Sequence, residues 1–338
     1  MKYISLFSGI GGFELAIQNI LPKAKCIGFS EVDKFALQVY QHHFPDHRNL
    51  GDVTKITEED IKSLVDEHRG CDMLVGGFPC TNLTSLARQN KHCNSDGLDG
   101  PKSGLFWEMI RVIEWIEKYN EVYGVTLHLI IENNASMKNV YKKQITETLD
   151  KCVRSEVYMT HLNGADFGVQ TRQRLYWTTF PIDETGIECI QSWSDILIPL
   201  DSIDKRDLLG DDHILNTGNK TSSVSSTSSK VILVKHGKVW RTQLTTTLRS
   251  KSNWQMGRHS STDIEKCVPI TRNRNIHTCL WDCRIGNHCM LVRYFDSNEV
   301  ERLFFFPDGW VSDLCSKTRS LKLLGNTVIV KVIEFIVL

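Results

Sequence analysis

This sequence lacks a net charge, a membrane-spanning run and a cysteine framework. Its 40 Lys and Arg balance 40 Asp and Glu, so total charge alone predicts no polyanionic partner. The longest apolar stretch, at 327–338, is too short to span a bilayer and contains Lys331 and Glu334. No basic, apolar and small-residue series follows Met1, so we expect a protein that is neither secreted nor membrane-bound. Its 11 cysteines show no regular spacing, which favours reduced thiols in the cytoplasm or nucleus.

The first 180 residues alternate between strand-like and helix-like segments. Buried strands are predicted where short apolar runs end at turn residues, at 2–7, 24–30, 73–75, 127–131, 157–162 and 175–180. Apolar residues with helical spacing separate these runs, and Thr57-Glu58-Glu59-Asp60 has the acidic first turn of a helix. The alternation predicts an α/β fold with a doubly wound, mainly parallel sheet and helices on both faces.

The composition changes after residue 180. Residues 183–212 are net acidic, 216–230 form a Ser/Thr-rich linker, and 230–274 contain ten Lys or Arg. A basic face hidden under zero net charge is typical of a lobe that binds a polyanion, although an ordinary solvated surface has the same composition. We therefore expect a large domain at 1–180, a smaller irregular lobe at 181–290, and a return to the large domain at 291–338.

A glycine turn and a carboxylate predict the kind of cofactor. Gly9-x-Gly11-Gly12 lies between the first strand and the first helix, where a ligand can approach the backbone. Glu31 ends the second strand, where a βαβ unit can hold both ribose hydroxyls. The third glycine of the dinucleotide fingerprint is missing, and no phosphate-binding side chain follows the turn. A nucleoside cofactor without a pyrophosphate fits better than NAD or ATP, and S-adenosylmethionine is such a cofactor.

Candidate catalytic groups follow two other strands. Gly76-Gly77 breaks the strand at 73–75, and Cys80 comes just past its carboxyl end, where open α/β sheets bind ligands. The thiol is a candidate nucleophile; the alternative is a small buried hydrophobe. Glu132 also ends a predicted strand, and burial beside a thiol would favour its protonated form. The alternative is an ordinary carboxylate that forms a salt bridge at a strand end. Gln170-Thr171-Arg172-Gln173-Arg174 places two arginines where they suit a carbonyl oxygen or a phosphate.

Together these segments resemble, in order and over essentially the whole chain, the motifs of the cytosine-5 DNA methyltransferases. The motifs are Phe7-Ser8-Gly9-x-Gly11-Gly12, Gly76-Gly77-Phe78-Pro79-Cys80, Glu132-Asn133, Gln170-x-Arg172-x-Arg174 and Gly325-Asn326-Thr327-Val328. The segment at 293–310, with Glu299-x-x-Arg302-Leu303, is similar to that family's penultimate motif, although Phe304-Phe305 stands where the family often has Gln-Gly.

The resemblance implies a class I, Rossmann-like methyltransferase fold, with 181–290 as the target-recognition lobe. Cys80 would attack carbon 6 of a cytosine flipped out of the duplex. Glu132 would protonate ring nitrogen 3, while Arg174, supported by Arg172, would hold the cytosine carbonyl and a phosphate. Carbon 5 would then take the methyl group, and β-elimination would release Cys80.

The resemblance also implies two binding sets. S-adenosylmethionine would be bound by Phe7, Ser8, Gly9, Gly11, Gly12, Glu31, Val32, Asp52, Val53, Pro79, Asn326 and Val328, with Asp52 at the adenine and Glu31 at the ribose. Double-stranded DNA would be bound by Ser85, Arg88, Lys91, Gln170, Lys235, Arg241, Arg249 and Lys251.

Two other functions stay open. One branch of this family methylates tRNA, but the basic lobe and the absence of a Cys-Phe-Thr tripeptide weigh against that substrate. A catalytically silent DNA-binding regulatory homologue is the second alternative, although it would not need Cys80, Glu132 and Arg174 together.

We expect a monomer with no metal. The cluster that could ligate zinc has spacings that fit no common finger: His277, Cys279, Cys283, His288 and Cys289.

Overall fold

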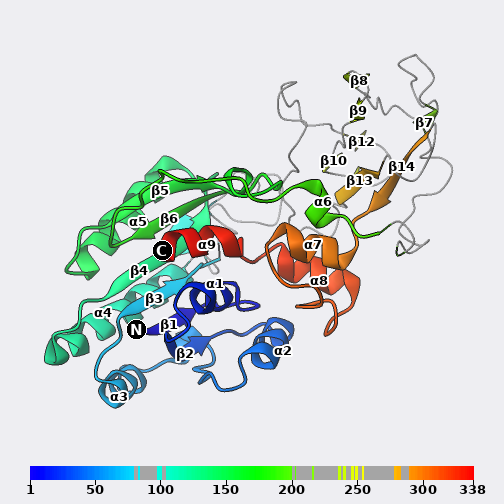
Figure 1. Ribbon diagram of the computed structural model, residues 1–338. Coiled ribbons are helices and arrows are strands. Elements are labelled where there is room, and N and C mark those ends of the chain that lie inside the picture. The colour runs from blue at the N-terminus through cyan, green and yellow to red at the C-terminus, as the bar shows by residue number, and fades with distance from the viewer. Residues whose placement is uncertain are drawn as a thin grey trace. The chain divides into compact units, whose positions relative to one another are not determined.

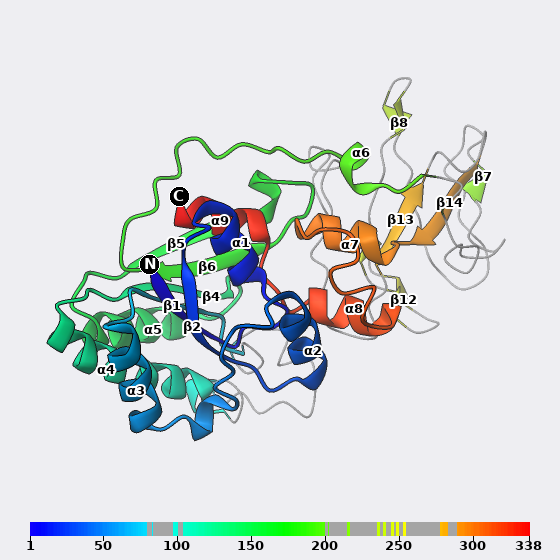
Figure 2. The same cartoon turned by 60° about the horizontal axis from the view of Figure 1, so that its bottom comes forward.

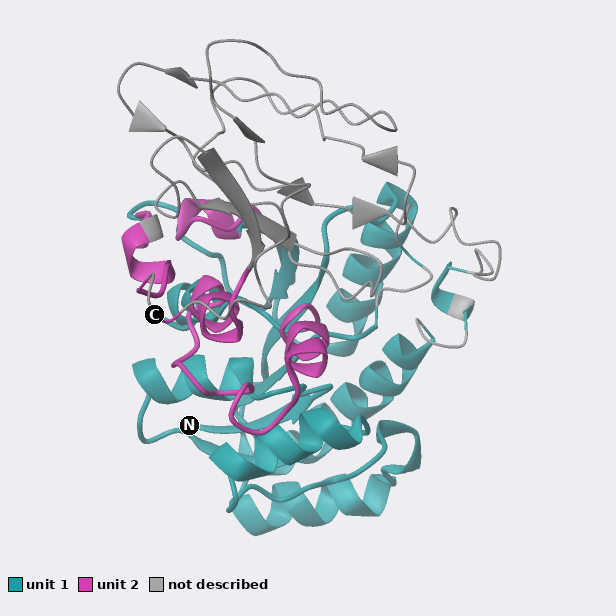
Figure 3. Ribbon diagram, turned by 90° about the vertical axis from the view of Figure 1, so that its right-hand side faces the viewer, with its two compact units in different colours: residues 1–163, 173–187, 327–338 teal, residues 164–172, 188–326 magenta. Residues whose placement is uncertain are grey.

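The computed structural model describes residues 1–79, 83, 97–100, 104–199, 202 and 295–338, together with the backbone of short strands between 215 and 294 (Figure 1). The chain divides into two compact units, which are coloured separately in Figure 3. The first comprises 1–163, 173–187 and 327–338, and the second comprises 164–172 and 188–326.

The first unit is built on a six-stranded sheet in the order β2-β1-β3-β4-β6-β5. Strands β1 to β4 pair in parallel, whereas β6 runs antiparallel to both of its neighbours. The predicted mainly parallel sheet is therefore confirmed. The strands are β1 (Lys2–Leu6), β2 (Lys25–Ser30), β3 (Met73–Gly76), β4 (His128–Asn134), β5 (Tyr158–Asn163) and β6 (Gln173–Thr178).

Helices cover both faces of this sheet (Figure 2). On one face, the buried residues of β1, β3, β4 and β6 form a single apolar core with α3, α4 and α5. Helices α1 and α9 pack against each other on the opposite face, where the Asn19 amide donates to Glu334 at 2.6 Å. The helices of this unit are α1 (Gly12–Ile20), α2 (Lys34–His43), α3 (Glu58–His68), α4 (Leu105–Tyr123), α5 (Asn139–Cys152) and α9 (Val330–Val337).

Local sequence explains where these helices begin and which face they bury. Thr57 and Asp60 form a capping box at the start of α3, as its acidic first turn predicted. Helix α4 buries Met109, Val112, Ile113 and Ile116 completely, because apolar residues recur there at helical spacing. Most of the C-terminal apolar stretch at 327–338 forms the helix α9.

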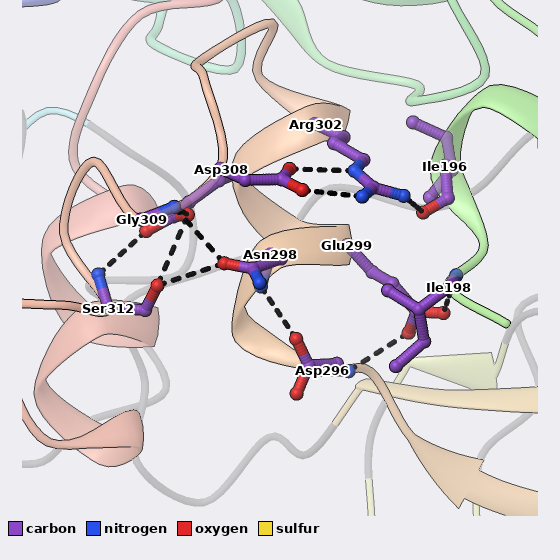
Figure 4. Close-up of polar contacts among 10 residues, drawn as sticks. Ile196, Ile198, Asp296, Asn298, Glu299, Arg302, Asp308, Gly309 and Ser312 are labelled. Carbon is purple, nitrogen blue, oxygen red and sulfur yellow. Dashed lines mark hydrogen bonds and ion pairs between the residues drawn. The ribbon is translucent and has the colours of Figure 1, made fainter. Parts of the chain in front are cut away.

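In the second unit, α7 (Ser297–Leu303) organises the segment around it (Figure 4). Asp296 and Glu299 form a capping box, and Glu299 also accepts from the Ile198 backbone at 3.0 Å. Arg302 makes a two-pronged ion pair with Asp308 and donates to the Ile196 carbonyl at 3.1 Å. Helix α7 thus holds both the loop that follows it and the segment at 196–198, which is about a hundred residues away in sequence.

Other elements of this unit are short. They comprise η4 (Gly164–Asp166), α6 (Trp193–Ile196), α8 (Lys317–Leu324), and the strands β7 (Leu215–Asn216), β8 (Lys235–His236), β9 (Val239–Trp240), β10 (Thr245–Thr246), β11 (Leu248–Arg249), β12 (Asn253–Trp254), β13 (Thr278–Asp282) and β14 (Cys289–Tyr294). No helix in the described part of the chain is long and apolar enough to cross a membrane. The described side chains include no group of three or more potential metal ligands.

Candidate active site

The glycine turn after β1 has an unusual backbone. Phe7, Gly9 and Gly11 have φ values of 56°, 59° and 87°, and a left-handed Phe is uncommon. A Cβ at Gly11 would lie 2.5 Å from the Phe44 ring, so this position needs glycine for packing as well as for φ. At Gly9, by contrast, a Cβ would meet no atom within 4 Å. The turn therefore packs on one side at Gly11 and is open at Gly9, where a ligand can reach the backbone.

Glu31 ties this turn to the end of β2. Its Oε2 accepts from the Gly9 amide at 2.8 Å, and its Oε1 accepts from the amides of Val32 and Asp33 at 2.7 and 2.8 Å. An ionised carboxylate has about four acceptor positions, so one is left for a ligand hydroxyl. Predicted cofactor residues from two separate motifs thus lie within hydrogen-bonding distance of each other.

Asp52 belongs to the same part of the first unit. The Ser30 hydroxyl, next to Glu31, donates to the Gly51 carbonyl at 2.6 Å, which brings the segment before Asp52 alongside the end of β2. Asp52 caps the short turn η1 (Val53–Lys55). Donation from the backbone and hydroxyl of Thr54 lowers the pKa of the Asp52 carboxyl, so this partly exposed group is anionic at neutral pH.

A hydrogen bond and a ring contact hold the backbone just before the predicted nucleophile. Cys80 itself lies outside the described residues. Two positions earlier, the Phe78 carbonyl accepts from the Asn133 side chain at 3.0 Å, and the Phe78 ring packs on Phe106. Asn133 is 1% exposed, on β4. A buried amide therefore connects β4 to the segment that carries the thiol.

Glu132 and Arg174 form an ion pair. Arg174 Nε lies 2.7 Å from Glu132 Oε1, and both side chains are 15% exposed. The pair crosses between the antiparallel strands β4 and β6. The second carboxylate oxygen, Oε2, lies 2.7 Å from where a Cβ at Gly77 would stand. The structure thus brings together Glu132 and Arg174 as a salt bridge, and the predicted protonated form of Glu132 stays a prediction.

The other members of the Gln170–Arg174 motif lie in the second unit. Arg172 is buried, donates to the Gly325 carbonyl at 3.2 Å and lies 5.1 Å from the centre of the Phe304 ring. This packing accounts for a buried aromatic residue at 304, where the family often has Gln. Gln170 is 1% exposed, and its amide has no hydrogen-bond partner among the described residues.

The remaining predicted cofactor residues differ in exposure. Ser8 is buried and donates to the Ser30 carbonyl at 3.2 Å, whereas Val32 is 68% exposed. Gly12 opens α1. Val53 and Val328 are buried in the first unit. Two residues remain. Pro79 is half-buried in the first unit, and Asn326 is the last residue of the second unit.

All the predicted DNA-binding residues stay predictions. The side chains outside the described part of the chain include Ser85, Arg88, Lys91, Lys235, Arg241, Arg249 and Lys251. The side chains of the Cys/His cluster at 277–289, weighed above as a zinc site, also lie outside it.

Comparison with known proteins decides the family. The model of the family described as C-5 cytosine-specific DNA methylase matches residues 1–338. The chain belongs to this family. Type II methyltransferase M1.ScrFI of Lactococcus lactis subsp. cremoris is 28% identical over 340 residues, which cover 99% of this chain and 76% of that protein. Type II methyltransferase M.HhaI of Haemophilus parahaemolyticus is 30% identical over 186 residues, or 54% of this chain and 50% of that protein.

A solved structure agrees on the fold of this methylase. The Entamoeba histolytica methyltransferase EhMeth matches with a TM-score of 0.61 and 17% identity, over 99% of this chain and 96% of that one. The predicted class I methyltransferase fold is confirmed. The predicted function and enzyme class, a DNA cytosine-5 methyltransferase, are confirmed by the family match and the curated relatives.

Two positions in this methylase have structural roles that the sequence did not reveal. The Glu132-Asn133 motif does not predict that the Asn133 side chain donates a hydrogen bond to the Phe78 carbonyl. Gly77 was read as a strand breaker, whereas its missing side chain also leaves room for the Glu132 carboxylate. The sequence does contain one signal for Asn133. Asparagine is disfavoured in strands, and a buried polar side chain requires a hydrogen-bond partner.

Proposed function

We propose that this methylase transfers a methyl group from S-adenosylmethionine to carbon 5 of a cytosine flipped out of double-stranded DNA, through a covalent bond to Cys80. The observation that carries the site assignment is the placement of Glu132 and Arg174 as a pair, with Asn133 holding the backbone of the segment that leads to Cys80. A nucleophile, an acid and a cation would then act on one ring.

The residues present fit the cofactor. Gly9 has open space where a side chain would stand, and so does Gly51 beside Asp52. Glu31 keeps one acceptor position for a ribose hydroxyl, and the anionic Asp52 can accept from the adenine amine. S-adenosylmethionine supplies an electrophilic methyl group when bound. The exposed side chain of Val32 is available to cover a face of the adenine.

The protein's own groups would act on the cytosine in sequence. The Cys80 thiolate adds to carbon 6, while Glu132 hydrogen-bonds or protonates ring nitrogen 3, so that electron density moves to carbon 5. Arg174 is already bound to one oxygen of Glu132 and can hold the cytosine carbonyl from the same side. After carbon 5 has taken the methyl group, β-elimination transfers the carbon 5 proton to solvent water and releases the Cys80 thiolate, while the proton on nitrogen 3 returns to Glu132.

The partner and setting follow from the same family. Duplex DNA is the substrate we infer, with the predicted basic lobe at 230–274 as a phosphate-binding surface. Two relatives carry the name of type II methyltransferases of bacteria, which supports a role in bacterial DNA modification and a cytoplasmic location. A monomer suffices for this chemistry.

The deciding experiment measures transfer of labelled methyl from S-adenosylmethionine to unmethylated duplex DNA and, in parallel, to tRNA. Wild-type protein is expected to label duplex DNA, and sequencing of the methylated cytosines then gives the recognition site. Cys80→Ser should abolish labelling while cofactor binding, measured by calorimetry, stays within about twofold of wild type, because the thiol contributes to bond formation rather than to binding.

Three outcomes would contradict the proposal. Label on tRNA alone would favour the RNA-methylating alternative. Tight DNA binding without label would favour the catalytically silent homologue. Unchanged activity in Cys80→Ser would remove the covalent mechanism.

A further inference from the structure

Arg111, on α4, contacts both ends of the turn that follows Asp52. Its Nη1 atom donates to the Ile56 carbonyl at 2.7 Å, and its Nη2 atom donates to the Val53 carbonyl at 3.0 Å. These two carbonyls belong to the first residue of η1 and to the residue after it, and Asp52 caps the N-terminus of the same turn. A single planar group therefore holds the turn at two points.

The guanidinium is itself held in place. Glu108, one helical turn earlier, accepts from Arg111 Nε at 2.8 Å and pairs with Nη2. Trp115, one turn later, places its ring centre 4.5 Å from the guanidinium carbon. The Arg111 side chain is only 32% exposed. The carboxylate and the ring already restrict the Arg111 side chain, so it loses little further conformational entropy when it binds the two carbonyls. Its hydrogen bonds therefore hold η1 in one position.

The turn has few bonds of its own. Within it, the Lys55 amide donates to the Asp52 carbonyl at 2.8 Å, and the Ile56 amide reaches the Val53 carbonyl only at 3.4 Å. The internal hydrogen bonds of such short turns have poor geometry, so contacts with the rest of the fold determine the position of the turn. The direction of the Asp52 carboxylate, bonded only to Thr54 among the described contacts, then depends on how η1 is held.

We propose that Arg111 is a positioning residue of the cofactor site, which aims the Asp52 carboxylate at the adenine amine by holding both ends of η1. The inference rests on the proposed function, in which Asp52 meets the adenine of S-adenosylmethionine. Lysine cannot replace Arg111 here, because one ammonium group keeps the charge but cannot reach two carbonyls in fixed directions.

A double-mutant cycle tests this role. Calorimetric titration of the full-length chain with S-adenosylmethionine is carried out for wild type, Arg111→Lys, Asp52→Asn and the double variant. Arg111→Lys should weaken binding about tenfold in the wild-type background, as expected for one lost charge-assisted hydrogen bond. In the Asp52→Asn background the same change should cost less than about twofold, because Arg111 then has no carboxylate to aim.

Matched controls separate positioning from stability. Lys118→Gln removes a second α4 cation, whose Nζ lies 2.6 Å from Glu58 on α3, and should leave cofactor affinity unchanged. Arg111→Lys should raise KM for the cofactor and leave kcat near wild type. If Arg111→Lys does not fold, Glu108→Gln, which removes only the brace, takes its place in the cycle and should weaken binding about threefold.

The proposal is overturned if Arg111→Lys binds the cofactor as tightly as wild type. It is also overturned if the loss is equal in both Asp52 backgrounds, since that result means that Arg111 acts on the fold as a whole. A wild-type chain that does not bind S-adenosylmethionine refutes the proposed function itself, which distinguishes that failure from a failure of Arg111's role.

Discussion

Replacing Glu14 with Gln should make the protein more stable above neutral pH. Glu14 lies on α1, directly after the glycine turn, and is fully buried. Its Oε1 accepts from the Tyr40 hydroxyl at 3.1 Å, and that hydroxyl also contacts His47 Nδ1 at 3.0 Å. Burial raises the pKa of the Glu14 carboxyl from 4.5 to about 7, because the loss of hydration outweighs the hydrogen bonds that favour the charged form.

The sign and size of the effect follow from this pKa. The folded state binds the Glu14 proton more tightly than the unfolded state, so the stability linked to this proton is fully present below pH 4.5 and is lost as pH rises through 7. The total loss is about 3 kcal/mol, most of which falls between pH 5 and pH 8. Gln keeps the acceptor for Tyr40 without the charge.

Urea unfolding at both pH values measures this directly. The difference in unfolding free energy between Glu14→Gln and wild type should shift by about 2–3 kcal/mol in favour of the variant from pH 5 to pH 8. Glu147→Gln, an exposed glutamate on α5 with a 56% exposed side chain, is the matched control and should show no such shift. Our reasoning about Glu14 is refuted if its variant and wild type keep the same difference at both pH values.

Three further substitutions separate chemistry from folding. Gly77→Ala places a methyl 2.7 Å from Glu132 Oε2, so methylation should slow at least about tenfold with cofactor affinity retained; a wild-type rate would mean that the carboxylate position is not critical. Asn133→Ala leaves the Phe78 carbonyl without its amide donor, so it should lower the methylation rate and also lower the stability in thermal unfolding by about 1–3 kcal/mol. Unchanged values of both would mean that this hydrogen bond does not position the segment. Thr57→Ala removes the α3 cap and should lower stability by about 1 kcal/mol without altering kcat, whereas a kcat change would link α3 to catalysis.

The sequence alone was sufficient to predict the six strands of the large sheet and their alternation with helices. Apolar periodicity predicted the strands and the buried face of α4, and the acidic turn at 57–60 predicted the start of α3. The rule that ligands meet the carboxyl ends of parallel strands predicted that Glu31 and Glu132 end their strands; Glu31 directly follows β2, whereas β4 continues to Asn134, so Glu132 lies inside that strand, near its end. These signals are local, since each depends on residues a few positions apart or on one topological rule.

Only the tertiary structure decided which groups touch. Glu132 pairs with Arg174 because β6 returns antiparallel beside β4, and no local pattern sets that register. Glu14 looks like an ordinary first-turn acid in the sequence, yet it is completely buried. Arg111 resembles any helix-surface cation until α4 is packed beside η1. Charge, burial and hydrogen-bond partners depend on contacts between distant segments, so they are properties of the folded chain rather than of local sequence.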